Sequence, residues 1–242
     1  GLCSLETLRN FHGFAFLSDP RATNGVLEGN PLHEEALSVA RLAPPDFGLN
    51  VVVNRRRELV GAFAGHFDQA HLEACALVRR CACPPVRTEA DLAVTSCGGY
   101  PLDATFYQAV KGLVGCLPAV RKGGKIVAFA GCSEGIGGPE YTELMRRYAG
   151  RLDDFLEDFR ESGTFIKDQW ELQMHARVLA KVRQEDLHFV TDGLGQDELD
   201  FLSVHGHAAP PGGVGRAAQE LIDALLADEL LGRIEPLRQN GS

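Results

Sequence analysis

The sequence has no long apolar run, and its first residues do not have the pattern of a secretory leader; both absences bear on the class of protein to expect. No stretch approaches the roughly 18 to 20 uninterrupted apolar residues that a membrane-spanning helix needs. The N-terminus also lacks the basic and then apolar layout of a signal peptide. We therefore expect a cytoplasmic protein without a membrane partner.

The sequence also lacks an excess of positive charge and a regular set of cysteines that would indicate disulfide bonds. The 24 basic residues are outnumbered by 33 acidic ones, and the formal net charge of -9 argues against nucleic acid as a partner. Seven cysteines, from Cys3 to Cys132, form an odd and scattered set in a chain too long to need disulfides, so we expect reduced thiols. Cys81 and Cys83 form only a C-x-C, which is too sparse to predict a zinc site.

The size of the chain predicts one large or two small domains. Its 242 residues are 45% hydrophobic, which is enough to bury a sizeable core. The helical and strand periodicity breaks at Pro84-Pro85, which polar residues follow, so we place a domain boundary near residue 85. The opening "GLCSLETLRNFH" has no initiator methionine and no strand or turn to anchor a first element. We expect the chain to be part of a longer protein.

The section before the boundary reads as helix, hairpin and helix. Asn30 and Pro31 begin a run with apolar residues at helical spacing, "GNPLHEEALSVARLA". The β-rich runs "LNVVVN" and "ELVGAFAG" flank a charged turn and predict a hairpin. "HFDQAHLEACALVRRC" is helical in pattern again.

The section after the boundary reads as a small doubly wound α/β domain. The buried-strand runs "ADLAVTS" and "GKIVAFAG" are separated by the helix-like "DATFYQAVKGLVGCLPAV", which predicts a parallel β-α-β unit. Further helices are expected at 138–149, 153–162, 168–183 and 214–230, and a strand at "DLHFVTD". Ligands of such sheets bind beyond the carboxyl ends of the strands, where Gly98-Gly99 and residues 131–138 fall.

A helix face in this unit suits a small carboxylate. Tyr107 and Gln108 lie four and three residues before Lys111, so all three share one face, and Asp103 is placed to cap the helix. Cation, amide and helix N-terminus together can bind a carboxylate. By spacing alone, Lys111 can equally be a solvated surface lysine. The loop "GCSEGIGG" matches neither nucleotide fingerprint, which favours an ordinary strand-to-helix turn.

Three segments, "GLCSLETLRNFH", "GGYPLDATFYQAVKG" and "DQWELQ", occur in the order found in one known family. In these segments the chain resembles the nickel-dependent lactate racemases, and the similarity runs through nearly its whole length. The resemblance implies that residues 1–85 are the C-terminal part of a truncated cofactor-binding domain. It implies that residues 86–215 form a C-terminal α/β domain that contacts substrate, and that residues 216–242 form a helix and tail that packs back on the N-terminal domain.

The resemblance also implies residue roles. His12 would be the protein ligand of nickel, held in a nickel pincer nucleotide, a pyridinium thioamide/thiocarboxylate mononucleotide. Tyr107, Gln108, Lys111 and Trp170 would bind substrate. The cofactor-carrying lysine, two acid/base histidines and a substrate-clamping arginine of the family would precede residue 1, so the chain alone is expected to be inactive. Without the resemblance, His12 and Trp170 each have an ordinary structural explanation.

The function implied is racemisation or epimerisation of a small 2-hydroxy acid of the lactate type, by hydride transfer to the pincer cofactor. Two alternatives stay open: a non-catalytic binding or assembly module on the same fold, and a nucleotide-binding α/β enzyme. The identity of the hydroxy acid and the oligomeric state are left open.

Other reactive residue types are assigned no chemistry. His205 and His207 form an H-x-H that can bind metal, but a Gly/Pro-rich exposed loop favours a structural interpretation. Cys97 stands where we expect a residue such as Asn. The remaining histidines are scattered: His33, His66, His71, His175 and His188.

Overall fold

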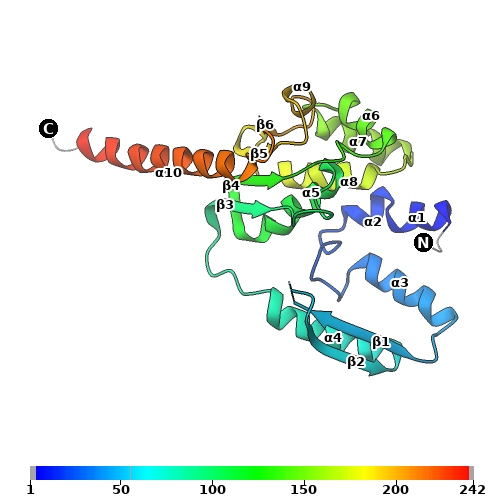
Figure 1. The fold of residues 1–242 in the computed structure, drawn as a ribbon. Helices are drawn as coiled ribbons and strands as arrows, with labels where there is room; N and C mark the ends of the chain where they lie inside the picture. Colours follow the sequence, from blue (N-terminus) through cyan, green and yellow to red (C-terminus); the bar gives the residue numbers. More distant parts are fainter. Residues whose placement is uncertain (1–3, 55, 240–242) are drawn as a thin grey trace. The chain divides into compact units, whose positions relative to one another are not determined.

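A computed structural model describes residues 4–54 and 56–239 and divides the chain into two compact units (Figure 1). The division falls between Arg87 and Thr88. Cys3 and residues 240–242, which the expectations above include, lie outside the described residues. The six described cysteines are free thiols.

The N-terminal unit contains a hairpin covered on one side by a helix. Its elements are α1 (Leu5–Phe11), α2 (Phe14–Ser18), α3 (Pro31–Leu42), β1 (Gly48–Val53), β2 (Leu59–Gly65) and α4 (Phe67–Ala82). β1 and β2 pair antiparallel, as the sequence predicts, and α4 packs against both. α3 begins as predicted, because the Asn30 side chain accepts a hydrogen bond from the backbone N–H of Leu32 and Pro31 fills the first turn.

The C-terminal unit confirms the α/β class with a parallel sheet. Its elements are β3 (Ala90–Ser96), α5 (Phe106–Cys116), η1 (Leu117–Ala119), β4 (Val120–Ala130), α6 (Pro139–Arg147), α7 (Leu152–Ser162), α8 (Gln169–Leu179), η2 (Gln184–Asp186), β5 (Leu187–Thr191), α9 (Gln196–Leu199), β6 (His205–Ala208) and α10 (Val214–Gln239). The four described strands run parallel in the order β3-β4-β5-β6. α10 contacts β4 and β5. No helix in the described part of the chain has the length and apolarity to cross a bilayer.

The core of the C-terminal unit lies between the sheet and helices α5 and α8. Every residue of β5 is buried, as is usual for a central parallel strand. Phe189 of β5 meets Phe106 of α5 edge to face, with ring centroids 5.0 Å apart. α5 packs in turn against α8. This packing fixes the two helices that carry the candidate substrate residues.

Two local expectations were wrong. The N-cap of α5 is Thr105, whose Oγ1 accepts from the backbone N–H of Gln108 at 3.2 Å, and not Asp103. Asp103 lies two residues before this cap. Its side chain instead accepts a hydrogen bond from the backbone N–H of Gly131, in the loop after β4, at 2.9 Å. His205 and His207 lie in a strand, not in a loop, because β5 offers a full parallel ladder for β6 to join.

The loops after β3, β4 and β5 are bound to one another at the carboxyl edge of the sheet. Thr191 Oγ1 donates to the backbone oxygen of Gly131 at 3.1 Å. A side chain at Gly193 would place its Cβ 2.2 Å from that same oxygen, so only glycine fits. The loop 131–138 also receives the backbone N–H groups of Phe106 and Tyr107 at 3.1 and 2.9 Å. These bonds set the direction of α5.

Candidate functional site

Tyr107, Gln108, Lys111 and Trp170 come together in the C-terminal unit. Trp170 Nε1 of α8 donates to the Tyr107 hydroxyl of α5 at 2.7 Å. Lys111 Nζ donates to Gln108 Oε1 at 2.6 Å and lies 5.6 Å from the centre of the Tyr107 ring. Tyr107, Gln108 and Trp170 are partly buried, whereas Lys111 is exposed on this unit. The cluster therefore places a cation and an amide beside the aromatic rings of Tyr107 and Trp170.

The cluster rests on tightly packed aromatic residues. The Tyr141 ring of α6 meets Tyr107 edge to face at 5.2 Å. Tyr141 is fully buried, and its hydroxyl has no hydrogen-bond partner among the described residues. Gly137 allows the close approach, because a Cβ there would lie 3.0 Å from Tyr107 Cβ and its φ is +148°. Tyr107 is thus held from two sides, by Trp170 and by Tyr141.

The N-terminus of α5 does not contribute free amides, which corrects the expected anion site. Its backbone N–H groups are already used: Phe106 and Tyr107 donate to loop 131–138, and Gln108 and Ala109 donate to Thr105. A carboxylate here would rely on the side chains of Lys111 and Gln108. The amide groups of loop 131–138 are also engaged, since those of Cys132 and Glu134 donate to the 103–104 backbone. That loop connects β4 to α6, as predicted, and offers no phosphate cradle at these two groups.

Glu171 is a titratable group that the sequence analysis missed. It follows Trp170 on α8, is 3% exposed, and its Oε1 has no hydrogen-bond partner among the described residues. Burial raises the pKa of Glu171 to about 7, with Lys111 acting against the rise and Asp168 adding to it. The available signal was its spacing: Glu171, His175 and Val178 follow the buried stripe of α8.

Tyr107 remains a protonated hydroxyl at neutral pH. Burial raises the pKa of Tyr107 to about 12; the hydrogen bond from Trp170 opposes the rise, and Glu171 and Asp168 add to it. The Tyr107 oxygen accepts the hydrogen bond from the Trp170 N–H. The proton of the Tyr107 hydroxyl is not used in this bond and can be donated elsewhere. The pair can therefore present a hydrogen-bond donor to an oxygen of a ligand.

Cys97, just before the double glycine, is not a reactive thiol. It is 7% exposed, and burial, followed by Cys132 and Asp103, raises the pKa of Cys97 to about 12. The pKa of Cys132 is also raised to about 12 by burial, against the effect of Thr191. Thiols that stay protonated are poor nucleophiles and poor metal ligands.

His12 belongs to the N-terminal unit, apart from the other predicted site residues in the sequence. It follows α1 as its C-cap, and its backbone N–H donates to Leu8 O at 2.8 Å. The side chain is partly buried. Its assignment as a nickel ligand stays a prediction.

Comparison with known proteins gives consistent matches. Residues 86–207 match the family model described as the lactate racemase C-terminal domain. The chain is 37% identical over 180 residues to a lactate racemase of Thermoanaerobacterium thermosaccharolyticum, which covers 74% of this chain and 42% of that protein. It is 32% identical over 202 residues to a lactate racemase of Lactiplantibacillus plantarum, covering 81% and 46% respectively.

A solved structure extends the match to most of the chain. The lactate racemase apoprotein from Thermoanaerobacterium thermosaccharolyticum is similar with a TM-score of 0.77 and 32% identity, covering 90% of this chain and 52% of that one. In the two sequence matches, the chain spans less than half the length of each lactate racemase. The matched range 86–207 includes the whole Tyr107–Trp170 cluster.

Proposed function

The chain belongs to the family that shares the lactate racemase C-terminal domain, and from this premise we propose that it serves the racemisation or epimerisation of a small 2-hydroxy acid. The observation that carries the proposal is the meeting of Lys111, Gln108 and the Tyr107–Trp170 pair within the matched domain. A 2-hydroxy acid carries a carboxylate and a hydroxyl on neighbouring carbons. The cluster offers a complementary donor for each.

Lys111 and Gln108 are proposed to hold the substrate carboxylate. Lys111 Nζ already donates a hydrogen bond to the side-chain oxygen of Gln108 at 2.6 Å. A carboxylate would compete for this ammonium group as a charged acceptor, and Gln108 would add its amide N–H. Hydrogen bonds to charged groups are worth about 1.5 to 3 kcal/mol. Lys111 should contribute more than Gln108, because its ammonium group is a cation and the Gln108 amide is neutral.

Tyr107 is proposed to bind the substrate through its hydroxyl, positioned by Trp170. The 2.7 Å bond from Trp170 Nε1 fixes the Tyr107 oxygen. The raised pKa of about 12 keeps the Tyr107 proton in place. In this arrangement Trp170 acts through Tyr107, which differs from the expectation that Trp170 itself binds substrate.

The residues present fit a nickel pincer nucleotide as far as His12 is concerned. A neutral imidazole is a nitrogen donor that nickel accepts. When bound, the cofactor would supply a hydride acceptor, which would allow the configuration of the substrate carbon to invert. The task of Lys111 and Gln108 is then to keep the carboxylate fixed while the carbon beside it is planar.

The single indole of the chain provides the test. Trp170 is the only tryptophan in the sequence, so its N–H gives one side-chain resonance of this type in a ¹H–¹⁵N spectrum. Titration of the chain with L-lactate should shift this resonance in a saturable way. The Lys111→Ala variant should weaken the response by about 10-fold or more, while Lys122→Ala, an exposed lysine of β4, should leave it unchanged.

The same titration separates the alternatives. A binding or assembly module without hydroxy acid specificity would leave the Trp170 resonance in place with lactate. An equal response of wild type and Lys111→Ala would show that Lys111 is a surface lysine and would refute the proposed carboxylate site.

A further inference from the structure

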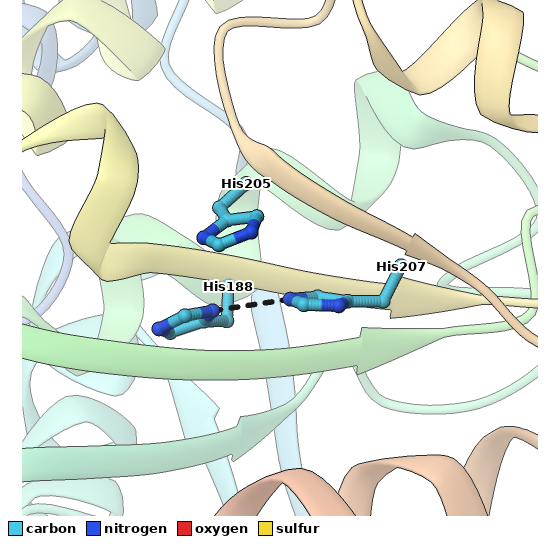
Figure 2. A group of neighbouring side chains, drawn as sticks. All are labelled: His188, His205 and His207. Carbon is cyan, nitrogen blue, oxygen red and sulfur yellow. Dashed lines mark hydrogen bonds between the residues drawn. The ribbon is translucent and has the colours of Figure 1, made fainter. Parts of the chain in front are cut away.

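Three histidines of the C-terminal unit gather on one face of the sheet, away from any role assigned above. His188 lies on β5, and His205 and His207 lie on the neighbouring strand β6 (Figure 2). The parallel register pairs His188 with His205, and His207 is two residues further along β6. Side chains two apart on a strand share a face, so the register brings all three imidazoles together.

Gly206 secures this placement. It separates the two histidines of β6, and a Cβ there would lie 2.5 Å from the Cβ of Leu199. The opposite face of β6 is therefore filled by α9, and the histidines face away from it.

The nitrogen spacing is close to that of a metal site. One ring nitrogen from each histidine lies within 4.8 Å of the other two. His188 Nδ1 and His207 Nε2 are 3.1 Å apart. With metal–nitrogen bonds of about 2.0 to 2.1 Å, ligand nitrogens at a tetrahedral ion are about 3.3 Å apart. One pair therefore already has nearly this spacing, and the third ring, His205, is exposed.

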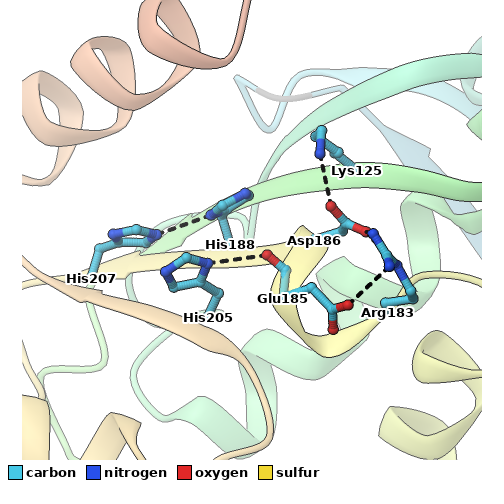
Figure 3. Close-up of polar contacts among 7 residues, drawn as sticks. All are labelled: Lys125, Arg183, Glu185, Asp186, His188, His205 and His207. Carbon is cyan, nitrogen blue, oxygen red and sulfur yellow. Dashed lines mark hydrogen bonds and ion pairs between the residues drawn. The ribbon is translucent and has the colours of Figure 1, made fainter. Parts of the chain in front are cut away.

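The protonation state also suits metal binding. His205 Nδ1 lies 3.1 Å from the backbone oxygen of Glu185 (Figure 3), and since a carbonyl only accepts, this nitrogen carries the proton. The other nitrogen of His205 then has a free lone pair, in the arrangement that fixes metal-binding histidines in known sites.

The nearby charges leave an all-imidazole ligand set. Asp186 is bound by Lys125 at 2.8 Å and by Arg183 at 2.7 Å, and Arg183 also lies 3.1 Å from the Glu185 carboxylate (Figure 3). Both carboxylates are thus engaged by cations. Imidazole ligands suit zinc, nickel, copper and cobalt, whereas magnesium and calcium need oxygen ligands. A hollow of about 380 Å³ lies beside His205.

We propose that His188, His205 and His207 form a second metal site, independent of His12, that binds one divalent first-row transition ion such as Zn²⁺. Three imidazoles coordinate the ion, and water takes the remaining positions. The hydrogen bond between His188 and His207 is replaced when the ring that donates it moves its proton to its other nitrogen, so both lone pairs face the ion. No net proton is released by this change of tautomer. The ion joins the edge strand β6 to β5.

The test uses Co²⁺ as a spectroscopic substitute, added to the reduced chain. We expect one ion per chain with the visible absorption of a nitrogen- and oxygen-ligated site. His207→Ala should weaken binding by about a hundredfold or more, beyond the 10- to 100-fold typical of lost outer-shell partners. His66→Ala, a histidine of the N-terminal unit, is the matched control and should bind Co²⁺ as the wild type does. Zn²⁺ should raise the Tm of the wild type but not that of His207→Ala.

His205→Ala guards against misfolding, because His205 is exposed and its removal leaves the core intact. This variant should keep the wild-type circular dichroism and also lose Co²⁺ affinity. The proposal is overturned if either variant binds Co²⁺ with unchanged affinity, or if the spectrum shows thiolate-to-cobalt charge transfer, which would place the ion on cysteines.

Discussion

Glu171 is the residue at which burial and charge conflict most directly in the candidate site. The residue is 3% exposed, and its pKa of about 7 lies well above the ordinary value of 4.5. The folded state therefore holds the Glu171 proton more tightly than the unfolded state between these two pH values. By linkage, the contribution of Glu171 to stability falls as pH rises from about 4.5 to 7 and stays low above that.

We predict that Glu171→Gln becomes more stable, relative to the wild type, as the pH rises. The difference in free energy of unfolding between the two proteins should shift by about 2 to 3 kcal/mol in favour of the variant from pH 4 to pH 8. Urea titrations at several pH values measure this. His175 and His188, whose pKa values are lowered to about 4, give the opposite slope, but they are present in both proteins and cancel.

Glu143→Gln, an exposed position on α6, is the control for loss of a surface carboxylate. If the Glu171→Gln difference is the same at all pH values, Glu171 does not titrate in this range in the folded state. The description of Glu171 as a buried carboxyl group with a raised pKa would then be incorrect.

The sequence predicted part of this site at the residue level. The spacing of Tyr107, Gln108 and Lys111 placed them on one helix face, and the structure brings their side chains together. Glu171 and Tyr141 were not found, because their burial depends on how α6 and α8 pack on α5, which local periodicity does not encode. The roles of these residues in binding substrate stay predictions.

At the level of elements, the sequence was informative where a pattern is local. The β3 run was placed at its observed bounds, and the hairpin and the β3-α5-β4 unit were correctly predicted. β6 was missed, since "HGHA" has no strand pattern and forms one only because β5 offers a partner. The sequence predicted Asp103 as the N-cap of α5, but the cap is Thr105. The Asp103 side chain instead accepts a hydrogen bond from the backbone of the loop after β4.

The junction of the β4 and β5 loops yields a prediction at this scale. Gly193→Ala should destabilise the protein by about 2 to 4 kcal/mol, because its Cβ would meet the backbone oxygens of Gly131 and Cys132 at 2.2 and 2.3 Å. These are backbone atoms, so a side-chain rotation cannot relieve the overlap. Thermal unfolding followed by circular dichroism measures the effect.

Gly195→Ala is the matched control, two residues further along the same loop. Its Cβ would meet only the Glu198 carboxylate, at 3.9 Å, which is ordinary contact. The two variants should therefore differ clearly in Tm. Equal Tm values would show that the loops are not held together at Gly193 in solution.

At the level of the whole molecule, the two units carry different candidate roles. His12, the candidate nickel ligand, lies in the N-terminal unit, and the candidate substrate residues lie in the C-terminal unit. The family and its α/β domain could be recognised from the order of motifs along the chain. The packing of residues 216–242 on the N-terminal domain stays a prediction; the described part of α10 contacts β4 and β5.

In the proposed function, Lys111 holds the carboxylate of a 2-hydroxy acid during racemisation. The test is kcat/KM for the conversion of L-lactate to D-lactate by the nickel-loaded protein in its full-length form, because the chain alone is expected to be inactive, compared between wild type, Lys111→Ala and the control Lys122→Ala. Loss of a charge-assisted hydrogen bond of about 1.5 to 3 kcal/mol predicts a fall of about 10- to 150-fold for Lys111→Ala, with unchanged nickel content. Lys122→Ala should keep the wild-type value. A Lys111→Ala protein with wild-type kcat/KM, or one that loses nickel instead, would show that Lys111 does not hold the substrate carboxylate.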